Sequence, residues 1–268
     1  MKLHAIAGLP RSGSTLLCNI LNQNPKFYAS STSPMVHAIN QLAAWFSNSP
    51  EVRSDLINNQ KDTEERMVDV ARSMMDAWYA GKPTVFDKSR GWTTNALIFE
   101  QLYPEGKMIV CVRDPRNVFA SIEKQHRRFP ILDHTDNPLE KTLYARADQM
   151  FSPQGMIGFP IVGVEDLIRR RPKSLILVQY ERFVQNPKEE MERIYKELGE
   201  PYFDHHFTGI KNTATDVDAL YNHKFPHKGE GDVVPSDPEE WKKYLSEDLA
   251  RVIIERYPHF NNTFGYER

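Results

Sequence analysis

The sequence predicts a three-layer α/β P-loop fold in which helices cover both faces of a central parallel sheet. Apolar runs alternate with helical patterns along the chain, which favours strands that pair in parallel. A glycine-rich loop joins the first of these strands to the first helix. Residues 1–268, 40% of them hydrophobic, suit one domain with an insertion better than two independent domains. The ligand of such a sheet is expected at the carboxyl ends of its strands.

The first unit is a strand, a loop and a helix. Residues 3–8 form a short apolar run, and residues 14–21 continue directly into a helical pattern. Pro10 and Gly13 confine the turn between them. This order places the loop at the carboxyl end of the first strand, where a ligand is expected.

Further units follow the same order. The apolar run 108–112 precedes a helix over 116–125, which Pro115 opens at its first turn. The other elements that the pattern predicts are strands over 84–86 and 174–178 and helices over 64–80, 93–102, 187–198 and 246–256. Residues 129–163, rich in Pro, Gly, Met and Phe, are the best candidate for a mobile or acceptor-binding insertion, and an ordinary surface excursion is the alternative.

The composition argues against several classes of partner. The 34 basic and 36 acidic side chains give a net charge of −2, so no global field predicts binding to nucleic acid or to an anionic membrane. Residues 28–50 lack Lys, Arg, Asp and Glu but contain Ser, Asn, Pro and His, and the N-terminus lacks a charged region followed by an apolar one. We therefore expect neither a membrane span nor a targeting segment.

The two cysteines, Cys18 and Cys111, both stand among apolar neighbours. This favours small buried hydrophobic side chains over a disulfide or a metal site. The expected location is the reducing cytoplasm.

The loop over residues 8–15, GLPRSGST, has the glycine spacing of a phosphate-binding loop. Such loops hold phosphate oxygens on backbone N–H groups at the N-terminus of a helix. Ser14 stands where a nucleotide kinase needs a lysine, and Arg11 instead offers a planar cation for bidentate contact with a phosphate. Ser12, Ser14 and Thr15 supply hydroxyl donors. A structural turn would explain the glycines alone, but the flanking strand and helix favour an anion site.

The segment GLPRSGSTLL resembles the 5′-phosphosulfate loop of sulfotransferases that use 3′-phosphoadenosine 5′-phosphosulfate (PAPS), in the Arg-Ser-Gly form of tyrosylprotein and many bacterial members. The arginine replaces the lysine of the cytosolic enzymes. The resemblance implies transfer of a sulfuryl group from PAPS to a hydroxyl or amine acceptor, with 3′-phosphoadenosine 5′-phosphate (PAP) as product and no metal. The donor contacts that it implies in this loop are Pro10, Arg11, Ser12, Gly13, Ser14 and Thr15.

The block VRDPRNVFAS at 112–121 is similar to the family's 3′-phosphate motif, in which an Arg and a Ser eight residues later hold the phosphate. Arg113 and Ser121 match these positions. Arg113 directly follows an apolar strand and Ser121 lies two turns into the next helix, so both can reach one anion near the strand ends. The alternative is a surface ion-pair role for these side chains.

Two shorter matches concern the adenine and the 3′-phosphate lid. The segment VQYERFV at 178–184 is similar to the family's RYEDLV block, whose tyrosine lies near the adenine, so Tyr180 is a candidate contact and a buried aromatic is the alternative. The segment HKGEGD at 227–232 resembles the RKGxxGDW loop, which implies Lys228 and Gly229. His227 replaces the arginine of that loop and no tryptophan follows directly, so a polar turn is the alternative.

Lys88 and Arg11 are the candidate transfer residues, because a cation beside the departing bridge oxygen stabilises the charge that develops there. The segment FDKSR at 86–90 occupies the place of the family's Lys-Thr-His, with Lys88 at the lysine and Arg90 where cytosolic enzymes carry the histidine base. Arginine cannot accept a proton, so we expect Arg90 to bind an acidic acceptor, a sulfonate oxygen or a neighbouring carboxylate. Asp87 should point away from the site if Lys88 points in.

The catalytic base is not fixed by these motifs. Tyrosylprotein and heparan enzymes use a glutamate shortly beyond the phosphate-loop helix, but residues 29–35 contain no acid. His37 is the nearest titratable group and becomes the candidate base, with a core or surface histidine as the alternative. His126 and His134, after the second phosphate helix, are the other candidates.

Two rival functions stay open. A kinase-like phosphotransferase would need magnesium and the missing lysine, and a non-catalytic nucleotide-binding module would need no base. The acceptor stays open among phenol, sugar, lipid and peptide hydroxyls, because loops set specificity. The chain could also form an oligomer.

Overall fold

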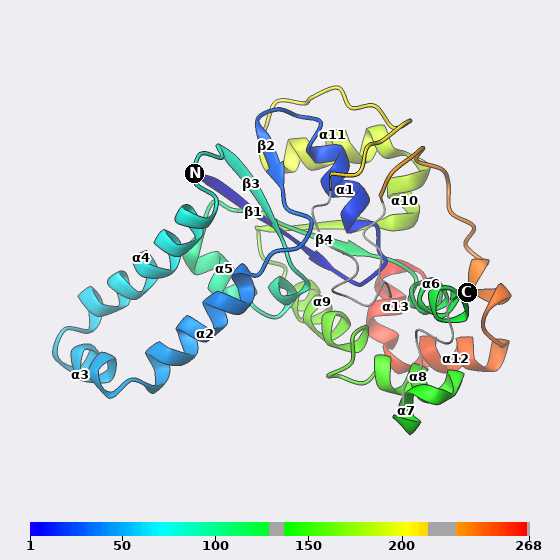
Figure 1. The fold of residues 1–268 in the computed structure, drawn as a ribbon, viewed down its shortest axis with the longest axis horizontal. Coiled ribbons are helices and arrows are strands. Elements are labelled where there is room, and N and C mark those ends of the chain that lie inside the picture. Colours follow the sequence, from blue (N-terminus) through cyan, green and yellow to red (C-terminus); the bar gives the residue numbers. More distant parts are fainter. Residues whose placement is uncertain (129–136, 214–228, 267–268) are drawn as a thin grey trace.

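The centre of the fold is a five-stranded parallel sheet (Figure 1). The computed structural model describes residues 1–128, 137–213 and 229–266. The strand order is β2-β3-β1-β4-β5, which confirms the predicted parallel sheet. The strands are β1 (Lys2–Gly8), β2 (Phe27–Ala29), β3 (Thr84–Lys88), β4 (Met108–Val112) and β5 (Leu175–Gln179).

The parallel register brings the functional segments to one edge. In the central pairs Ile6 lies opposite Lys88 and Gly8 lies opposite Cys111, while Val112 lies opposite Gln179. The phosphate loop, the end of β3 and the start of the segment after β4 therefore leave the sheet side by side. This is the edge at which ligands bind in open α/β sheets.

Helices cover both faces of the sheet, as predicted for three layers (Figure 1). Alternate strand residues point to opposite faces, so Ala5 joins one apolar core and Ile6 joins the other. The core that includes Ile6 is closed by α1 (Ser14–Leu21), α10 (Tyr180–Gln185) and α11 (Pro187–Leu198). The other core is closed mainly by α5 (Ala96–Leu102), α6 (Pro115–Arg128), α9 (Gly158–Arg170), α12 (Glu247–Arg256) and α13 (Pro258–Phe264).

Three helices form an arm that extends from the body (Figure 1). The arm consists of α2 (Met35–Asn48), α3 (Pro50–Asn58) and α4 (Gln60–Trp78). Ser49 caps α3 by accepting the Val52 N–H, which fixes the turn after α2. The short elements that remain are η1 (Arg90–Thr93), α7 (Pro138–Lys141), α8 (Leu143–Met150) and η3 (Glu240–Lys243). None of the helices within the described ranges is both long and apolar enough to cross a bilayer.

One predicted helix begins later than expected. The helix predicted over 93–102 begins at Ala96 as α5, and the 3₁₀ helix η1 precedes it over Arg90–Thr93. Ser89 accepts the Gly91 N–H and so opens η1 early, and the Asn95 amide donates to the Gly91 carbonyl at 2.7 Å and closes it. The cysteines match their prediction, since both Cys18 and Cys111 are buried and neither forms a disulfide.

Two buried histidines should make the fold sensitive to acid. Desolvation by burial lowers the pKa of both His4 and His205 to about 4. Nδ1 of His4 accepts the Lys107 N–H at 3.0 Å, which requires that nitrogen to be unprotonated. The folded pKa lies below the unfolded value near 6.5, so the stabilisation is complete above pH 6.5 and is lost as the pH falls toward 4.

Protonation of His4 alone should lower the free energy of unfolding by roughly 3 kcal/mol between pH 6.5 and pH 4. Urea unfolding of wild type and His4→Gln at pH 7 and pH 4.5 checks it, since the glutamine carbonyl can accept the same N–H without titrating. The variant should lose less stability on acidification. Equal losses in the two proteins would contradict the prediction.

Candidate donor-binding and transfer site

The phosphate loop turns sharply between β1 and α1. Gly8 has φ 123° and lies so close to β4 that a Cβ atom would sit 1.9 Å from the Cys111 carbonyl oxygen. Arg11 (φ 57°) and Gly13 (φ 84°) are both left-handed, and Ser12 Oγ donates to the Leu9 carbonyl at 2.6 Å. No side chain in the described ranges caps α1, so the N–H groups of its first turn are available to an anion.

Arg11 connects the loop to the second phosphate motif. Its Nε donates to Ser121 Oγ at 3.1 Å, and Nη1 of Arg113 donates to the Arg11 carbonyl oxygen at 3.1 Å. Arg113 Nε is buried and has no hydrogen-bond partner among the described residues. A buried guanidinium N–H without a partner is costly, so this donor fits a site that an anion completes.

Tyr180 packs against the same cluster from the start of α10. Its ring lies where a Cβ atom on Gly13 would approach Cδ2 to 2.5 Å, so only glycine allows this contact. The Arg113 guanidinium lies 4.5 Å from the ring centroid, a cation–π distance. The glycine of the loop, the arginine after β4 and the tyrosine after β5 thus form one contiguous surface.

Lys88 reaches the first turn of α1 from the end of β3. Its Nζ donates to Thr15 Oγ1 at 2.9 Å, and its backbone N–H donates to Ser30 Oγ at 2.8 Å. The ammonium group therefore stands beside the helix N-terminus that offers N–H groups to an anion. This arrangement can stabilise negative charge that forms near Thr15.

Asp87 points to the opposite face of the sheet, as strand alternation predicts. Its carboxyl group accepts hydrogen bonds from the Tyr79 and Ser33 hydroxyls and from Trp92 Nε1 at 2.7 Å. Burial raises the pKa of Asp87. Because the carboxyl group is fully buried among these donors, Asp87 serves to hold α4, η1 and the loop after β2 together.

A cavity of about 850 Å³ lies above these residues. Its walls include the phosphate loop, the segment 88–91, Arg113 and Tyr180, and the segment 229–234. Residues of the predicted insertion complete it, and these are Gln154, Gly155, Met156, Phe159 and Pro160. One hollow thus joins the cationic phosphate cluster to a largely apolar wall, as a site for two substrates requires.

Comparison with known proteins matches this arrangement to one family. The model of a family described as the sulfotransferase family matches residues 5–204. The chain belongs to the sulfotransferase family. A Caenorhabditis briggsae protein that carries the name of a protein-tyrosine sulfotransferase is 23% identical over 267 residues, which are 98% of this chain and 88% of that protein. Nodulation protein NoeE of Sinorhizobium fredii is 26% identical over 224 residues, 78% of this chain and about half (52%) of NoeE.

Solved sulfotransferase structures share the fold. The sulfotransferase domain of the Synechococcus PCC 7002 olefin synthase superposes with a TM-score of 0.58 at 18% identity, covering 100% of this chain and 96% of that one. Mouse sulfotransferase SULT7A1, solved as a complex with PAP, gives a TM-score of 0.55 at 16% identity, covering 100% and 86%. At these identities the likeness establishes the fold.

Most of the predicted donor residues of this sulfotransferase meet at the cavity. Ser12 is buried within the phosphate loop and does not line the cavity. Ser121 does not line it either, but it accepts a hydrogen bond from Arg11, which does. Gly229 is buried against α1, where its carbonyl accepts from Asn19 Nδ2 at 2.8 Å. Lys228 lies outside the described residues. The predicted residues that line the cavity are Pro10, Arg11, Gly13, Ser14, Thr15, Lys88, Arg113, Tyr180 and Gly229.

The two candidate base histidines that the structure describes do not lie at the cavity. His37 is exposed in the first turn of α2, and His126 is half-buried on α6, and neither lines the cavity. His134 lies outside the described residues. The geometry of the sulfotransferase therefore leaves the base unassigned.

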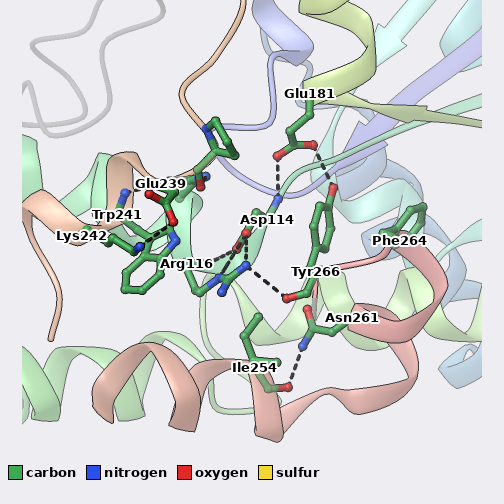
Figure 2. A network of polar contacts seen from close by, with 12 residues as sticks. Asp114, Arg116, Glu181, Glu239, Trp241, Lys242, Ile254, Asn261, Phe264 and Tyr266 are labelled. Carbon is green, nitrogen blue, oxygen red and sulfur yellow. Dashed lines mark hydrogen bonds and ion pairs between the residues drawn. The ribbon is translucent and has the colours of Figure 1, made fainter. Parts of the chain in front are cut away.

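Sequence reasoning missed a buried network that supports Arg113 (Figure 2). Glu181 accepts the Asp114 N–H and the Tyr266 hydroxyl, both at 3.0 Å. Arg116 donates to both oxygens of Asp114 and to the Tyr266 carbonyl at 3.1 Å. Desolvation raises the pKa of Glu181. The network ties the backbone directly after Arg113 to the C-terminal segment, and the acidic residue after Tyr180 was its only signal in the sequence.

Proposed function

We propose that this sulfotransferase transfers the sulfuryl group of PAPS to a hydroxyl of a small-molecule acceptor without a metal ion. The observation that supports it most is the unpartnered Nε of Arg113 within the cluster of Arg11, Arg113 and Ser121. PAPS carries a 3′-phosphate in addition to its 5′-phosphosulfate, so it needs two anion sites. The uncapped N-terminus of α1 and the cluster around Arg113 provide two such sites.

The proposed roles follow from these positions. The N–H groups of the α1 first turn and the Thr15 hydroxyl bind the 5′ side. Arg11, which belongs to the same loop and reaches Ser121 through its Nε, also acts on the 5′ side. Arg113 and Ser121 bind the 3′-phosphate, and Lys228, outside the described residues, is a further proposed contact for that phosphate. Tyr180 and Gly229 contact the adenosine part, since both lie against the start of α1.

In the transfer, the acceptor oxygen forms a bond to sulfur, the bond from sulfur to the bridge oxygen breaks, and the acceptor proton leaves to a base or to water. Lys88 stabilises the bridge oxygen as PAP departs. A sulfuryl group carries less charge than the phosphoryl group of a kinase reaction, so Lys88 and Arg11 suffice where a kinase needs a metal. Cys18 and Cys111 are buried and form no disulfide, which suits an enzyme of the reducing cytoplasm.

Donor turnover tests this proposal against a kinase-like phosphotransferase. The protein is incubated in EDTA with PAPS labelled in its sulfuryl group and with a panel of phenols, alcohols and sugars, and a parallel reaction contains labelled ATP and magnesium. We expect labelled product and PAP from the first reaction. Transfer from ATP with magnesium, together with intact PAPS, would contradict the proposal.

A further inference from the structure

The acceptor half of the cavity contains one cation that the proposed donor site does not use. Arg90 is the first residue of η1 and lines the cavity together with Thr32, Gln154, Met156 and Phe159. Ser89, between Lys88 and Arg90, has extended backbone angles of φ −152° and ψ 137°. Side chains two apart in extended chain point the same way, so Arg90 faces the cavity as Lys88 does, about 7 Å further along the chain.

The Arg90 side chain has no protein partner among the described residues, although its backbone carbonyl accepts from Thr93 Oγ1. Its guanidinium makes no hydrogen bond or ion pair there, whereas buried Arg116 pairs with Asp114 and buried Arg146 pairs with Glu123. The Arg90 side chain is exposed to the open cavity, and desolvation near the cavity walls lowers its pKa. Because the guanidinium has no protein counterion, it can form charge-assisted, bidentate hydrogen bonds to a carboxylate that enters the cavity.

Two carboxylates among the described residues line the same cavity as Arg90. Glu230 and Asp232 belong to the segment that packs on α1 through Gly229, and Asp232 is held there because it accepts the Gly209 N–H at 2.8 Å. No ion pair within the described residues joins either carboxylate to Arg90, and the pKa of Arg90 is lowered by desolvation alone, with no contribution from a carboxylate. The neighbouring carboxylate that the sequence allowed as a partner of Arg90 is therefore absent from the described residues.

The wall beside Arg90 is mainly apolar. Met156 just before α9 and Phe159 and Pro160 in its first turn line the cavity. Helix α9 packs directly on η1, where a Cβ atom on Gly163 would lie 2.8 Å from the Thr93 side chain. The Gln154 amide adds one neutral polar group. A monoanionic carboxylate suits this wall better than a dianionic phosphate, because the apolar surroundings make desolvation of the second charge costly.

We propose that Arg90 binds a carboxylate on the acceptor, so that the substrate is an alcohol or phenol with an apolar body and a carboxylate near the hydroxyl that receives the sulfuryl group. This inference rests on the proposed function. The carboxylate is not consumed in the transfer. It orients the acceptor, whose hydroxyl then lies toward Lys88.

Binding to the complex with PAP tests this without requiring turnover. Hydroxyaryl and hydroxyalkyl carboxylates, each paired with its primary amide and its phosphonate analogue, are titrated calorimetrically into protein saturated with PAP. A charge-assisted pair of about 1.5–3 kcal/mol predicts that at least one acid binds roughly 10- to 100-fold more tightly than its amide. Arg90→Gln should remove that difference, and Arg90→Lys should retain part of it.

Arg66→Gln is the matched control, because Arg66 is exposed on α4 and does not line the cavity. This variant should keep the wild-type preference, and thermal unfolding confirms that each variant is folded. Equal affinity for every acid and its amide, or an unchanged preference in Arg90→Gln, would overturn the inference, and tighter binding of the phosphonates would overturn the choice of a carboxylate. Failure of PAP to bind at all is a separate result, which would contradict the proposed function itself.

Discussion

Replacement of Lys88 by alanine should lower the turnover number by about 10²–10³-fold while the affinity for PAP changes much less. The Lys88 ammonium group lies 2.9 Å from Thr15 Oγ1, at the start of α1 where the 5′ side of the donor is proposed to bind. Charge on the bridge oxygen grows only as sulfur leaves it. Lys88 therefore acts on the transition state more than on the bound donor.

Steady-state kinetics at saturating PAPS and calorimetric titration with PAP separate the two effects. Lys88→Arg retains a cation and should recover part of the rate, and Lys61→Ala, an exposed residue of α4, is the neutral control. If PAP affinity collapsed while turnover at saturation stayed normal, Lys88 would be a ground-state anchor. Arg11 would then have to stabilise the transition state.

Replacement of Arg113 by alanine should weaken PAP binding by roughly tenfold to over a hundredfold, from the loss of a charge-assisted contact of about 1.5–3 kcal/mol. The unpartnered Nε of Arg113 is the donor to which this contact is assigned. The substitution also removes the hydrogen bond to the Arg11 carbonyl and the contact with Tyr180. A loss of PAP affinity by itself therefore does not distinguish a lost phosphate contact from a distorted loop.

Adenosine 5′-monophosphate provides the specific control, because it lacks the 3′-phosphate. Calorimetry should show that Arg113→Ala reduces the affinity for PAP much more than the affinity for the monophosphate. Equal losses for the two nucleotides would mean that Arg113 only maintains the shape of the loop. The 3′-phosphate assignment would then be wrong.

The elements that sequence predicts well are those whose ends are set by local chemistry. The strand 108–112 is a continuous apolar run and appears with those bounds as β4. The helix 187–198 begins with a proline at its first position and ends before Gly199, which has φ 70°, and α11 has the same bounds. By contrast, β2 has three residues and exists through its pairing with β3, which no local pattern reports.

The site residues likewise fall into those that local sequence predicts and those that depend on long-range contacts. Motifs locate the phosphate loop, Arg113 and Tyr180, because spacing relative to a strand end is a local property. The direction of the Arg11 side chain is not local, since the left-handed backbone at Arg11 directs it to Ser121, 110 residues away. The contact of Glu181 with Tyr266 spans 85 residues and likewise requires the fold.

The most direct test of PAPS as the donor is a calorimetric titration of the wild-type protein with PAP and with adenosine 5′-monophosphate, both in EDTA. We predict that PAP binds without metal and at least about tenfold more tightly than the monophosphate, because only PAP has the 3′-phosphate that Arg113 and Ser121 are proposed to bind. Equal affinity for the two nucleotides, or PAP binding that requires a metal ion, would contradict the account.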